Sequence, residues 1–600
     1  MAAITATTEV GETIPPLTAH AVSVSLPTWK SNVSYEEGEE WVLSKMKTGY
    51  PRFFIHKSIT QLAATVVNKY GVSGEQAILF PSNSVATRCK AFFQEQVADL
   101  SSQQARIIDF VLNPDEENSQ SRKNVSPNFS ALLFPAEHFG IAKQFWQHSG
   151  DGISSRRAEF CLKALEGGLV LEKSQAQDLQ RTCKGPKRYR KKTAIDPSVY
   201  AEDQDKSCTD VNGSTDRIDP MEFVEERFGR NLEVSFAANA KLAIRRRITG
   251  SLTADVDLNE ALEKVDDQER KRNVEGLSED DVYLYPTGMS AIFNTHQGLM
   301  KAKGRMKSII YGFPYVDTLK IVQKFGPGCL FYGYGSSEDL DDLEQRLENG
   351  ERYLALFTEF PGNPLLKTPD LQRIRALADK FDFCVVVDET IGNFLNVNVL
   401  PHADVVVSSL TKVFSGDSNV MGGSAILNPK SLNYKVLQQS WATEYEDNYW
   451  AEDSIFLERN SRDFVSRIDR INSNAEALCE MLRSHPRVKQ VNYPKYNSTR
   501  QFYDYCRNPN GGYGGLLSVM FHKKSDAITF FDHLETAKGP SLGTNFTLSS
   551  PYVILAHYSE LPWAASFGVG PDLIRFSVGL EDTGQLRAIF RRALDVISEQ

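Results

Sequence analysis

The sequence comprises 600 residues, of which 41% are hydrophobic and 24% charged, and it carries a formal net charge of −10 at pH 7. Because a single hydrophobic core stops growing near 300 residues, we expect about two to four domains. The acidic balance argues against a general attraction to nucleic acid or to anionic membranes and favours small polar metabolites as partners.

The N-terminus and the cysteines bear on the compartment. Residues 1–20, MAAITATTEVGETIPPLTAH, lack the basic start and the apolar core of a secretory signal, and no later apolar run is long enough to span a membrane. The eight cysteines are scattered without a CxxC pair, which is typical of a reducing compartment. We therefore predict a cytoplasmic protein, with a nuclear presence left open.

A change of composition divides the chain. Residues 1–173 are predicted to form a partly globular N-terminal extension. Residues 174–220 are polar, charged and almost without apolar periodicity, which predicts a surface connection or a disordered linker. The basic run KGPKRYRKK inside it could be a nuclear address or an RNA contact, although charge runs in polar linkers are usually only solvated.

Residues 221–455 alternate short apolar runs with helical patterns, as an α/β domain does. The runs MKSIIYGF, ERYLALFTE, FCVVVDE and ADVVVSSL predict strands, and the valine-rich ones predict burial on both faces of a mainly parallel sheet. Ligands of such sheets bind at the carboxyl ends of the strands. We therefore expect Glu359, Asp388 and the segment 408–412 to converge.

Residues 456–600 predict a smaller C-terminal α/β domain. Residues 455–485 have the pattern of one long amphipathic helix, and the runs after it, GGLLSVMFH, ITFFDHLETA, LIRFSVGLE and TGQLRAIFRRALDVI, alternate between strand and helix. We expect a cleft between this domain and the large one.

Lys412 follows a predicted buried strand and lies among the hydroxyl side chains of Ser408, Ser409 and Thr411. Partial loss of solvent there would favour a neutral, nucleophilic amine that can form a Schiff base. A solvent-exposed loop lysine is the alternative. Asp388 ends the neighbouring predicted strand and could hold a protonated pyridine nitrogen, although it could also be a helix N-cap.

These residues resemble the Cys/Met-metabolism group of pyridoxal-phosphate enzymes, whose lysine segment reads S-x-T-K-x-x-x-G-H-x-D. The resemblance implies fold type I, the aspartate aminotransferase-like fold with a mainly parallel sheet. It also implies that Lys412 is the Schiff-base lysine, that Ser409 and Thr411 contact the cofactor phosphate, and that Asp388 meets the pyridine nitrogen. Asp417 stands where the family has histidine, a departure that affects this loop but not the lysine.

Two further stretches resemble cofactor-binding motifs of the family. YPTGMSAI is similar to the phosphate loop S-S-G-M-A-A-I, which implies that Gly288 and Met289 meet the phosphate at a helix N-terminus. PYVDTLKI resembles Y-G-G-T-x-x-L, which implies that Tyr315 stacks on the pyridine ring and lies near the reacting Cα; a core tyrosine is the alternative.

Three stretches complete the resemblance. TEFPGNPLLKTPDL resembles E-x-P-x-N-P-L-L-x-x-x-D and implies that Asn363 lies near the phenolic oxygen of the cofactor. IRFSVGLED matches R-x-S-V-G-L-E-D and implies that Arg575 binds the substrate α-carboxylate through its two-pronged guanidinium. SLGTNFTL falls on the family's S-L-G and implies that Ser541 lies beside Arg575.

The family also uses a Y-x-R arginine, lent by a neighbouring subunit, to bind the phosphate. ERFGRNL offers Arg230, with Phe228 in place of the tyrosine, whereas GYPRFF offers Arg52 together with Tyr50. We favour Arg230 because of its distance from the phosphate loop. The two regions resemble each other, which suggests a remote duplication or an insertion that splits one arm.

The core motifs do not choose among the family's reactions. Three stretches of the front half nevertheless resemble the long fungal form of the cystathionine γ-synthases: IPPLTAHAVSVSLPTWKSNVSYEEG, GYPRFFIHKSI and the pair ERFGRNL and AKLAIRRRITG. That resemblance implies a pyridoxal-phosphate-dependent γ-replacement joining an O-acyl-L-homoserine, expected to be the O-acetyl ester, to L-cysteine. An O-acetylhomoserine sulfhydrylase, a cystathionine lyase and a catalytically inactive regulatory protein remain alternatives. We expect a homodimer or homotetramer, no nucleic-acid or membrane partner and no metal.

Overall fold

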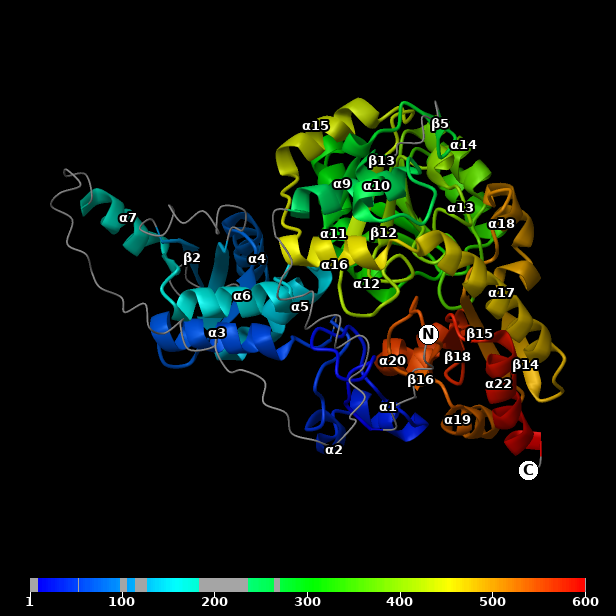
Figure 1. Ribbon diagram of the computed structural model, residues 1–600. Coiled ribbons are helices and arrows are strands. Elements are labelled where there is room, and N and C mark those ends of the chain that lie inside the picture. Colours follow the sequence, from blue (N-terminus) through cyan, green and yellow to red (C-terminus); the bar gives the residue numbers. More distant parts are fainter. Residues whose placement is uncertain are drawn as a thin grey trace.

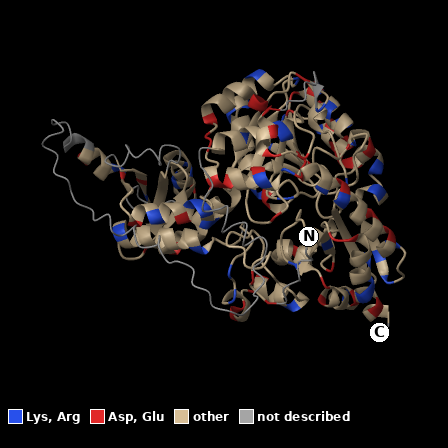
Figure 2. Ribbon diagram, viewed as in Figure 1, with Lys and Arg blue, Asp and Glu red and all other residues tan. Residues whose placement is uncertain are grey.

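The computed structural model describes residues 9–51, 53–97, 105–113, 127–182, 236–263 and 270–598 (Figure 1). Four parts are visible: an N-terminal segment (9–56), an N-terminal module (57–182), a large domain and a small C-terminal domain. Lysine, arginine, aspartate and glutamate are interspersed over all four (Figure 2). None of the helices in these ranges is both long and apolar enough to cross a membrane.

A mixed sheet with the strand order β7-β13-β12-β11-β10-β8-β9 forms the centre of the large domain. Neighbouring strands from β12 to β9 are parallel, whereas β13 is antiparallel to both β12 and β7. The predicted mainly parallel α/β domain is therefore confirmed. The strands are β7 (Val282–Tyr285), β8 (Ser308–Tyr311), β9 (Cys329–Tyr332), β10 (Ala355–Glu359), β11 (Cys384–Asp388), β12 (Val405–Ser409) and β13 (Gly423–Leu427).

Helices cover both faces of this sheet because its central strands are apolar on both sides. Val385 and Val387 of β11 belong to one buried cluster and Val386 to another, so successive side chains pack on opposite faces. The helices are α9 (Ala237–Thr249), α10 (Leu258–Glu263), α11 (Gly288–Lys303), α12 (Val316–Lys324), α13 (Ser337–Glu348), α14 (Leu371–Phe381), α15 (Tyr434–Glu444) and α16 (Ala451–Asn460).

The small domain contains a mostly antiparallel sheet in the order β14-β15-β18-β17-β16. Its strands are β14 (Val488–Asn492), β15 (Leu516–Phe521), β16 (Ala537–Lys538), β17 (Leu548–Ser550) and β18 (Ile574–Ser577). Its helices are α17 (Phe464–Arg483), α18 (Arg500–Cys506), α19 (Lys524–His533), α20 (Tyr552–His557), α21 (Leu561–Ser566) and α22 (Thr583–Ser598).

The prediction of one long helix over residues 455–485 was wrong, because the chain breaks between α16 and α17. At the break, the Ser461 hydroxyl donates to the Glu458 carbonyl at 2.8 Å. The Arg467 guanidinium donates to the Asn460 carbonyl at 2.9 Å. Side chains thus satisfy carbonyls that a continuous helix would have used, and the periodicity of the sequence does not reveal this.

The N-terminal module is a separate α/β unit with an antiparallel sheet in the order β1-β3-β2-β4. Its strands are β1 (Glu75–Phe80), β2 (Arg106–Leu112), β3 (Phe129–Pro135) and β4 (Val170–Glu172). Its helices are α3 (Lys57–Tyr70), α4 (Asn83–Gln96), α5 (Phe139–Ser149), α6 (Ser155–Glu166) and α7 (Lys173–Thr182). Helix α7 takes up the first part of the predicted linker, whose remainder lies outside the described residues.

The N-terminal segment runs along the small domain before it reaches the module (Figure 1). It contains α1 (Trp29–Glu36) and α2 (Glu40–Leu43). The Leu26 amide donates to the Lys538 carbonyl at 2.9 Å, and the Trp29 amide donates to Asp532 Oδ1 at 2.7 Å. These contacts fix the path by which the segment reaches the edge of the large domain.

Candidate active site

Three parallel strands of the large domain deliver polar side chains to one place. Glu359 at the end of β10 is in register with Asp388 at the end of β11, and Asp388 pairs with Val407 of β12. These strand ends border a cavity of about 190 Å³. The structure thus brings together the strand ends that the sequence predicted to converge, as expected for an open α/β sheet.

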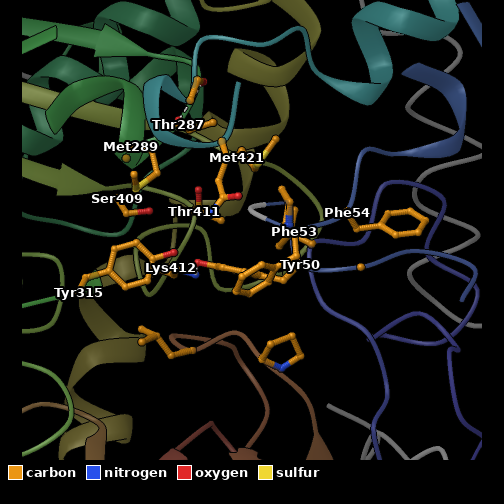
Figure 3. Close-up of a pocket in the computed structure, with 18 of the residues that line it drawn as sticks. Tyr50, Phe53, Phe54, Thr287, Met289, Tyr315, Ser409, Thr411, Lys412 and Met421 are labelled. Carbon is orange, nitrogen blue, oxygen red and sulfur yellow. Dashed lines mark hydrogen bonds between the residues drawn. The ribbon is translucent and has the colours of Figure 1, made fainter. Parts of the chain in front are cut away.

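Lys412 points into this cavity and is only 7% exposed. Its Nζ donates to Tyr50 Oη at 2.9 Å and to Ser541 Oγ at 3.2 Å. Tyr50 and Tyr315 lie on either side of Lys412 (Figure 3). Two hydroxyl groups from distant parts of the chain therefore hold the amine where it can act as a nucleophile or a base.

The turn after β12 sets the direction of Lys412. The Gly416 amide donates to the Lys412 carbonyl at 2.9 Å. Buried Arg467 of α17 donates to the carbonyls of Val413 and Phe414 at 2.9 and 2.8 Å. Because an irregular buried turn must find partners for its carbonyls outside regular secondary structure, Arg467 stabilises the backbone that carries the lysine.

Helix α11 begins at the cavity wall. Thr287 is its N-cap, and Thr287 Oγ1 accepts from the Ser290 amide at 3.0 Å. A Cβ on Gly288 would lie 2.5 Å from Ser409 Cβ, so only glycine lets the helix start this close to β12. Thr287, Gly288 and Met289 all line the cavity. The amides of a first helical turn favour an anion, which suits a phosphate group.

Glu359 holds the backbone of two predicted cofactor contacts. Its Oε1 accepts from the Tyr315 amide at 2.6 Å, and its Oε2 accepts from the Asn363 amide at 3.1 Å. Burial, together with the charge of nearby Asp388, raises the pKa of Glu359 to about 8. A buried carboxyl thus links the loops that carry Tyr315 and Asn363.

Asp388 is the second buried carboxyl of the pair. Its Oδ1 accepts from the Thr390 amide at 2.9 Å. Burial, with a contribution from Glu389, raises the pKa of Asp388 to about 6. A cation beside this carboxyl would favour its ionised form, so Asp388 suits a protonated ring nitrogen.

Arg575 enters the same cavity from β18 of the small domain and is 3% exposed. Its Nη2 donates to the Ser541 carbonyl at 2.8 Å and its Nη1 to Asn363 Oδ1 at 3.3 Å. The guanidinium carbon lies 4.4 Å from the centre of the Tyr552 ring. Burial lowers the pKa of Arg575 from its ordinary value. This fixed, desolvated guanidinium is suited to a substrate carboxylate.

The N-terminal parts contribute much of the wall, which few features of the sequence indicate. Tyr50, Phe53 and Phe54 of the N-terminal segment line the cavity (Figure 3). Trp146 and Gly150 line the cavity from the N-terminal module. The tyrosine of GYPRFF is the available signal, but that motif indicates only a candidate phosphate-binding arm, the less favoured of the two.

The predicted site residues are otherwise found together. Ser541 contacts Lys412 directly, and the cavity is lined by Gly288, Met289, Tyr315, Asn363, Asp388, Ser409, Thr411, Lys412 and Arg575. Arg230 and the alternative candidate, Arg52, lie outside the described residues, as does the basic run at 184–192. The choice between the two arginines stays a prediction. Within the described ranges, no group of three or more His, Cys, Asp or Glu side chains could hold a metal ion.

Comparison with known families identifies the fold and the chemistry. Residues 269–595 match the family described as Cys/Met metabolism PLP-dependent enzyme. The chain belongs to this family. Residues 58–154, within the N-terminal module, match a second family, the N-terminal domain of fungal trans-sulfuration enzymes. The family resemblance inferred from the motifs is therefore confirmed, and the cofactor is pyridoxal phosphate.

Individual relatives match over nearly the full length. Cystathionine gamma-synthase of Neurospora crassa is 52% identical over 99% of this chain and 99% of that protein. Cystathionine gamma-synthase of Saccharomyces cerevisiae is 38% identical over 98% of each. A crystal structure of cystathionine gamma synthase from Xanthomonas oryzae pv. oryzae covers 60% of this chain and 98% of its own, at 20% identity and a TM-score of 0.48.

The side chains of the cavity fit pyridoxal phosphate. Three groups border the same space: the Lys412 amine, the Asp388 carboxyl and the N-terminus of α11. The amine suits the carbonyl of the cofactor, the carboxyl suits its ring nitrogen, and the helix N-terminus suits its phosphate. A Cβ on Gly288 would lie 2.5 Å from Ser409 Cβ, so position 288 admits no side chain and the first turn of α11 can offer its backbone amides to the cavity. Arg575 remains for the amino-acid carboxylate.

Proposed function

We propose that the protein is a cystathionine γ-synthase that joins an O-acyl-L-homoserine to L-cysteine and yields L-cystathionine, in transsulfuration toward methionine. The observation that supports this most is the 52% identity with the Neurospora crassa enzyme over 99% of both chains, which includes the N-terminal module. The convergence of Lys412, Asp388 and Arg575 on one cavity supports an active enzyme over an inactive regulatory protein.

The roles of the residues follow from their positions. Bound pyridoxal phosphate supplies an electron sink for the carbon next to the amino group. Asp388 would keep the ring nitrogen protonated, and Lys412 would hold the cofactor covalently. Tyr315 is proposed to cover the ring, with Asn363 near its phenolic oxygen. Gly288 and Met289 are proposed to bind the phosphate through backbone amides, with Ser409 and Thr411 offering hydroxyls.

Substrate binding and proton transfer are proposed to involve Arg575, Ser541 and Lys412. Arg575 is proposed to bind the α-carboxylate, with Ser541 beside it, and this fixes the Cα–H bond relative to Lys412. Lys412, once its amine is free, would take the Cα proton and later return a proton there. The acyl carboxylate leaves from Cγ and the cysteine sulfur forms the new bond to that carbon, so the acid and cystathionine are released.

The lining supports a neutral acyl group. Phe53, Phe54, Trp146 and Ile153 form an apolar stretch of the wall. The described lining residues include one lysine, Lys412, and one arginine, Arg575. Both already have proposed roles, so neither is left to bind a second negative charge. A succinyl or phosphoryl ester would bring a further negative charge to this wall, so we propose O-acetyl-L-homoserine as the substrate.

A pair of assays tests the proposal. The purified enzyme, with one O-acylhomoserine, is supplied with cysteine or with sulfide, and cystathionine and homocysteine are measured. Faster cystathionine formation is expected. Predominant homocysteine formation would instead support a sulfhydrylase, and cleavage of cystathionine a lyase. Lys412→Ala should abolish both reactions and the visible absorbance of the bound cofactor; a wild-type protein that binds no cofactor would support the regulatory alternative.

Family enzymes are typically oligomeric, and we propose a homodimer or homotetramer. We also propose a cytoplasmic location, a phosphate contact from Arg230 or Arg52, and domain limits of 1–173, 174–220, 221–455 and 456–600. Light scattering of the purified protein tests the oligomeric state, and imaging of a tagged chain tests the location.

A further inference from the structure

A corner of the N-terminal module meets the start of the phosphate-facing helix α11. This corner is Gly150–Asp151, between α5 and α6. Thr287 Oγ1 donates to the Gly150 carbonyl at 3.1 Å, so the residue that caps α11 is also tied to the module. Asp151 Oδ1 accepts from the Ser290 hydroxyl and from Asn294 Nδ2, the latter at 3.1 Å.

Asp151 is a buried charge with partners on both sides of this contact. It is 4% exposed, and its Oδ2 accepts from Arg88 Nη2 of α4 at 3.1 Å. Arg88 Nη1 in turn donates to Asn294 Oδ1 at 2.8 Å. Burial raises the pKa of Asp151, and Arg88 opposes that rise. The result is a closed polar network that joins the module to the first two turns of α11.

Gly150 brings the backbones of the two parts into direct contact. Its φ of +63° lies in the left-handed region that favours glycine. A Cβ at this position would lie 2.4 Å from Thr287 Oγ1 and 2.7 Å from the Ser290 amide nitrogen. A larger residue at 150 must therefore move either the corner or the start of α11.

We propose that Asp151 is a positioning residue through which the N-terminal module sets the first turn of α11 and thereby controls how tightly the enzyme holds pyridoxal phosphate. The side chains of Asp151, Ser290 and Asn294 do not line the cavity, so Asp151 acts through the helix rather than on the cofactor. The amides of the first turn bind an anion only when they point at it, and the corner fixes their direction. The proposal rests on the family's cofactor and not on which thiol the enzyme uses.

The test measures cofactor affinity rather than turnover. Cofactor-free enzyme is titrated with pyridoxal phosphate, and the visible absorbance of the bound form is followed. Asp151→Asn and Gly150→Ala should each raise the dissociation constant about tenfold or more, the expected effect of misplacing hydrogen bonds to a charged group. The spectrum at saturation should keep its wavelength, because the groups that contact the ring are untouched.

Two variants in the same module serve as matched controls. Glu75→Gln removes another arginine-paired carboxylate, since Arg106 Nη2 lies 2.6 Å from Glu75 Oε2, away from α11. Gly74→Ala places a Cβ on a glycine of φ +85° with nothing within 4 Å of it. Both should leave the dissociation constant within about twofold of wild type.

Ser290→Ala provides a second test if Asp151→Asn does not fold. It removes the hydroxyl that donates to Asp151 and leaves the buried carboxylate in place. It should weaken cofactor binding in the same direction. Wild-type affinity in both Asp151→Asn and Ser290→Ala would overturn the proposal. Equal losses in Asp151→Asn and Glu75→Gln would overturn it too, since they would reflect general destabilisation of the module. Neither result depends on whether cystathionine is the product.

Discussion

Tyr50 and Lys412 are 362 positions apart in the sequence, yet Tyr50 Oη accepts a hydrogen bond from Lys412 Nζ at 2.9 Å. The lysine amine also lies 4.5 Å from the centre of the tyrosine ring. The N-terminal segment therefore contributes to the candidate active site, where it contacts the lysine that we propose forms the Schiff base. A hydroxyl at this distance can orient the amine and exchange a proton with it.

Removing the Tyr50 hydroxyl should slow turnover. In Tyr50→Phe the ring remains, but Lys412 keeps only Ser541 as a hydroxyl partner among its described hydrogen bonds. We expect kcat to fall about twofold to tenfold, because a buried hydrogen bond contributes about 0.5–1.5 kcal/mol. The KM for the homoserine ester should change little. Steady-state kinetics measure both.

Tyr503→Phe is the matched control for this loss. Tyr503 is fully buried in the small domain, and its hydroxyl donates to the Gly512 carbonyl at 3.0 Å, away from the cavity. This change should lower the melting temperature without a comparable fall in kcat. A kcat for Tyr50→Phe equal to that of Tyr503→Phe would contradict a direct role for the Tyr50 hydroxyl.

Mixed oligomers test whether Tyr50 serves its own chain. In the structure Tyr50 and Lys412 belong to one chain, whereas the family resemblance implied an arm lent by a neighbouring subunit. Differently tagged Lys412→Ala and Tyr50→Phe chains are co-expressed, and the mixed species is isolated. We expect activity no greater than the mean of the two homogeneous variants. Recovery toward half of the wild-type rate would place Tyr50 in a neighbouring subunit's site.

Much of the large domain was predictable because its signals are local. The valine runs that end at Asp388 and Ser409 indicate strands buried on both faces, and the order of such strands in an α/β sheet brings their carboxyl ends together. Lys412 and Gly288 belong to short motifs whose function depends on neighbours in the sequence. These elements could therefore be assigned without knowing the tertiary structure.

The parts that escaped prediction depend on contacts between distant residues. Asp151 is an ordinary loop aspartate in the sequence, and only the packing of α5 against α11 gives it Ser290 as a partner. The break between α16 and α17 depends on Arg467 reaching the Asn460 carbonyl. Hydrophobic periodicity carries no information on such pairings, because it reports which face is buried and not what lies against it.

Arg575→Lys should weaken substrate binding more than catalysis. A lysine cannot reproduce the two-pronged donation toward Ser541 and Asn363 or the contact with the Tyr552 ring. We expect the KM for the homoserine ester to rise about tenfold to a hundredfold, with a smaller change in kcat. Arg500→Lys on the surface of α18 is the control. A normal KM in Arg575→Lys would remove Arg575 from the proposed carboxylate site.

The buried carboxyls Glu359 and Asp388 should make the cofactor-free protein less stable as the pH rises. Their pKa values are raised to about 8 and about 6, whereas unfolded chains release these protons near pH 4. Between about pH 4 and 8 the folded state thus binds more protons than the unfolded state, so the free energy of unfolding falls through this window and levels off above it.

Glu359→Gln isolates the larger of these two contributions. The substitution keeps the shape but cannot ionise, so the melting temperature of the variant should fall less than that of wild type between pH 5 and pH 9. Differential scanning calorimetry of the cofactor-free proteins measures the difference. Glu166→Gln, on an exposed position of α6, should follow the wild-type curve. Parallel curves for Glu359→Gln and wild type would show that Glu359 is already ionised in the folded protein, and that its carboxylate is stabilised by the Tyr315 and Asn363 amides despite burial.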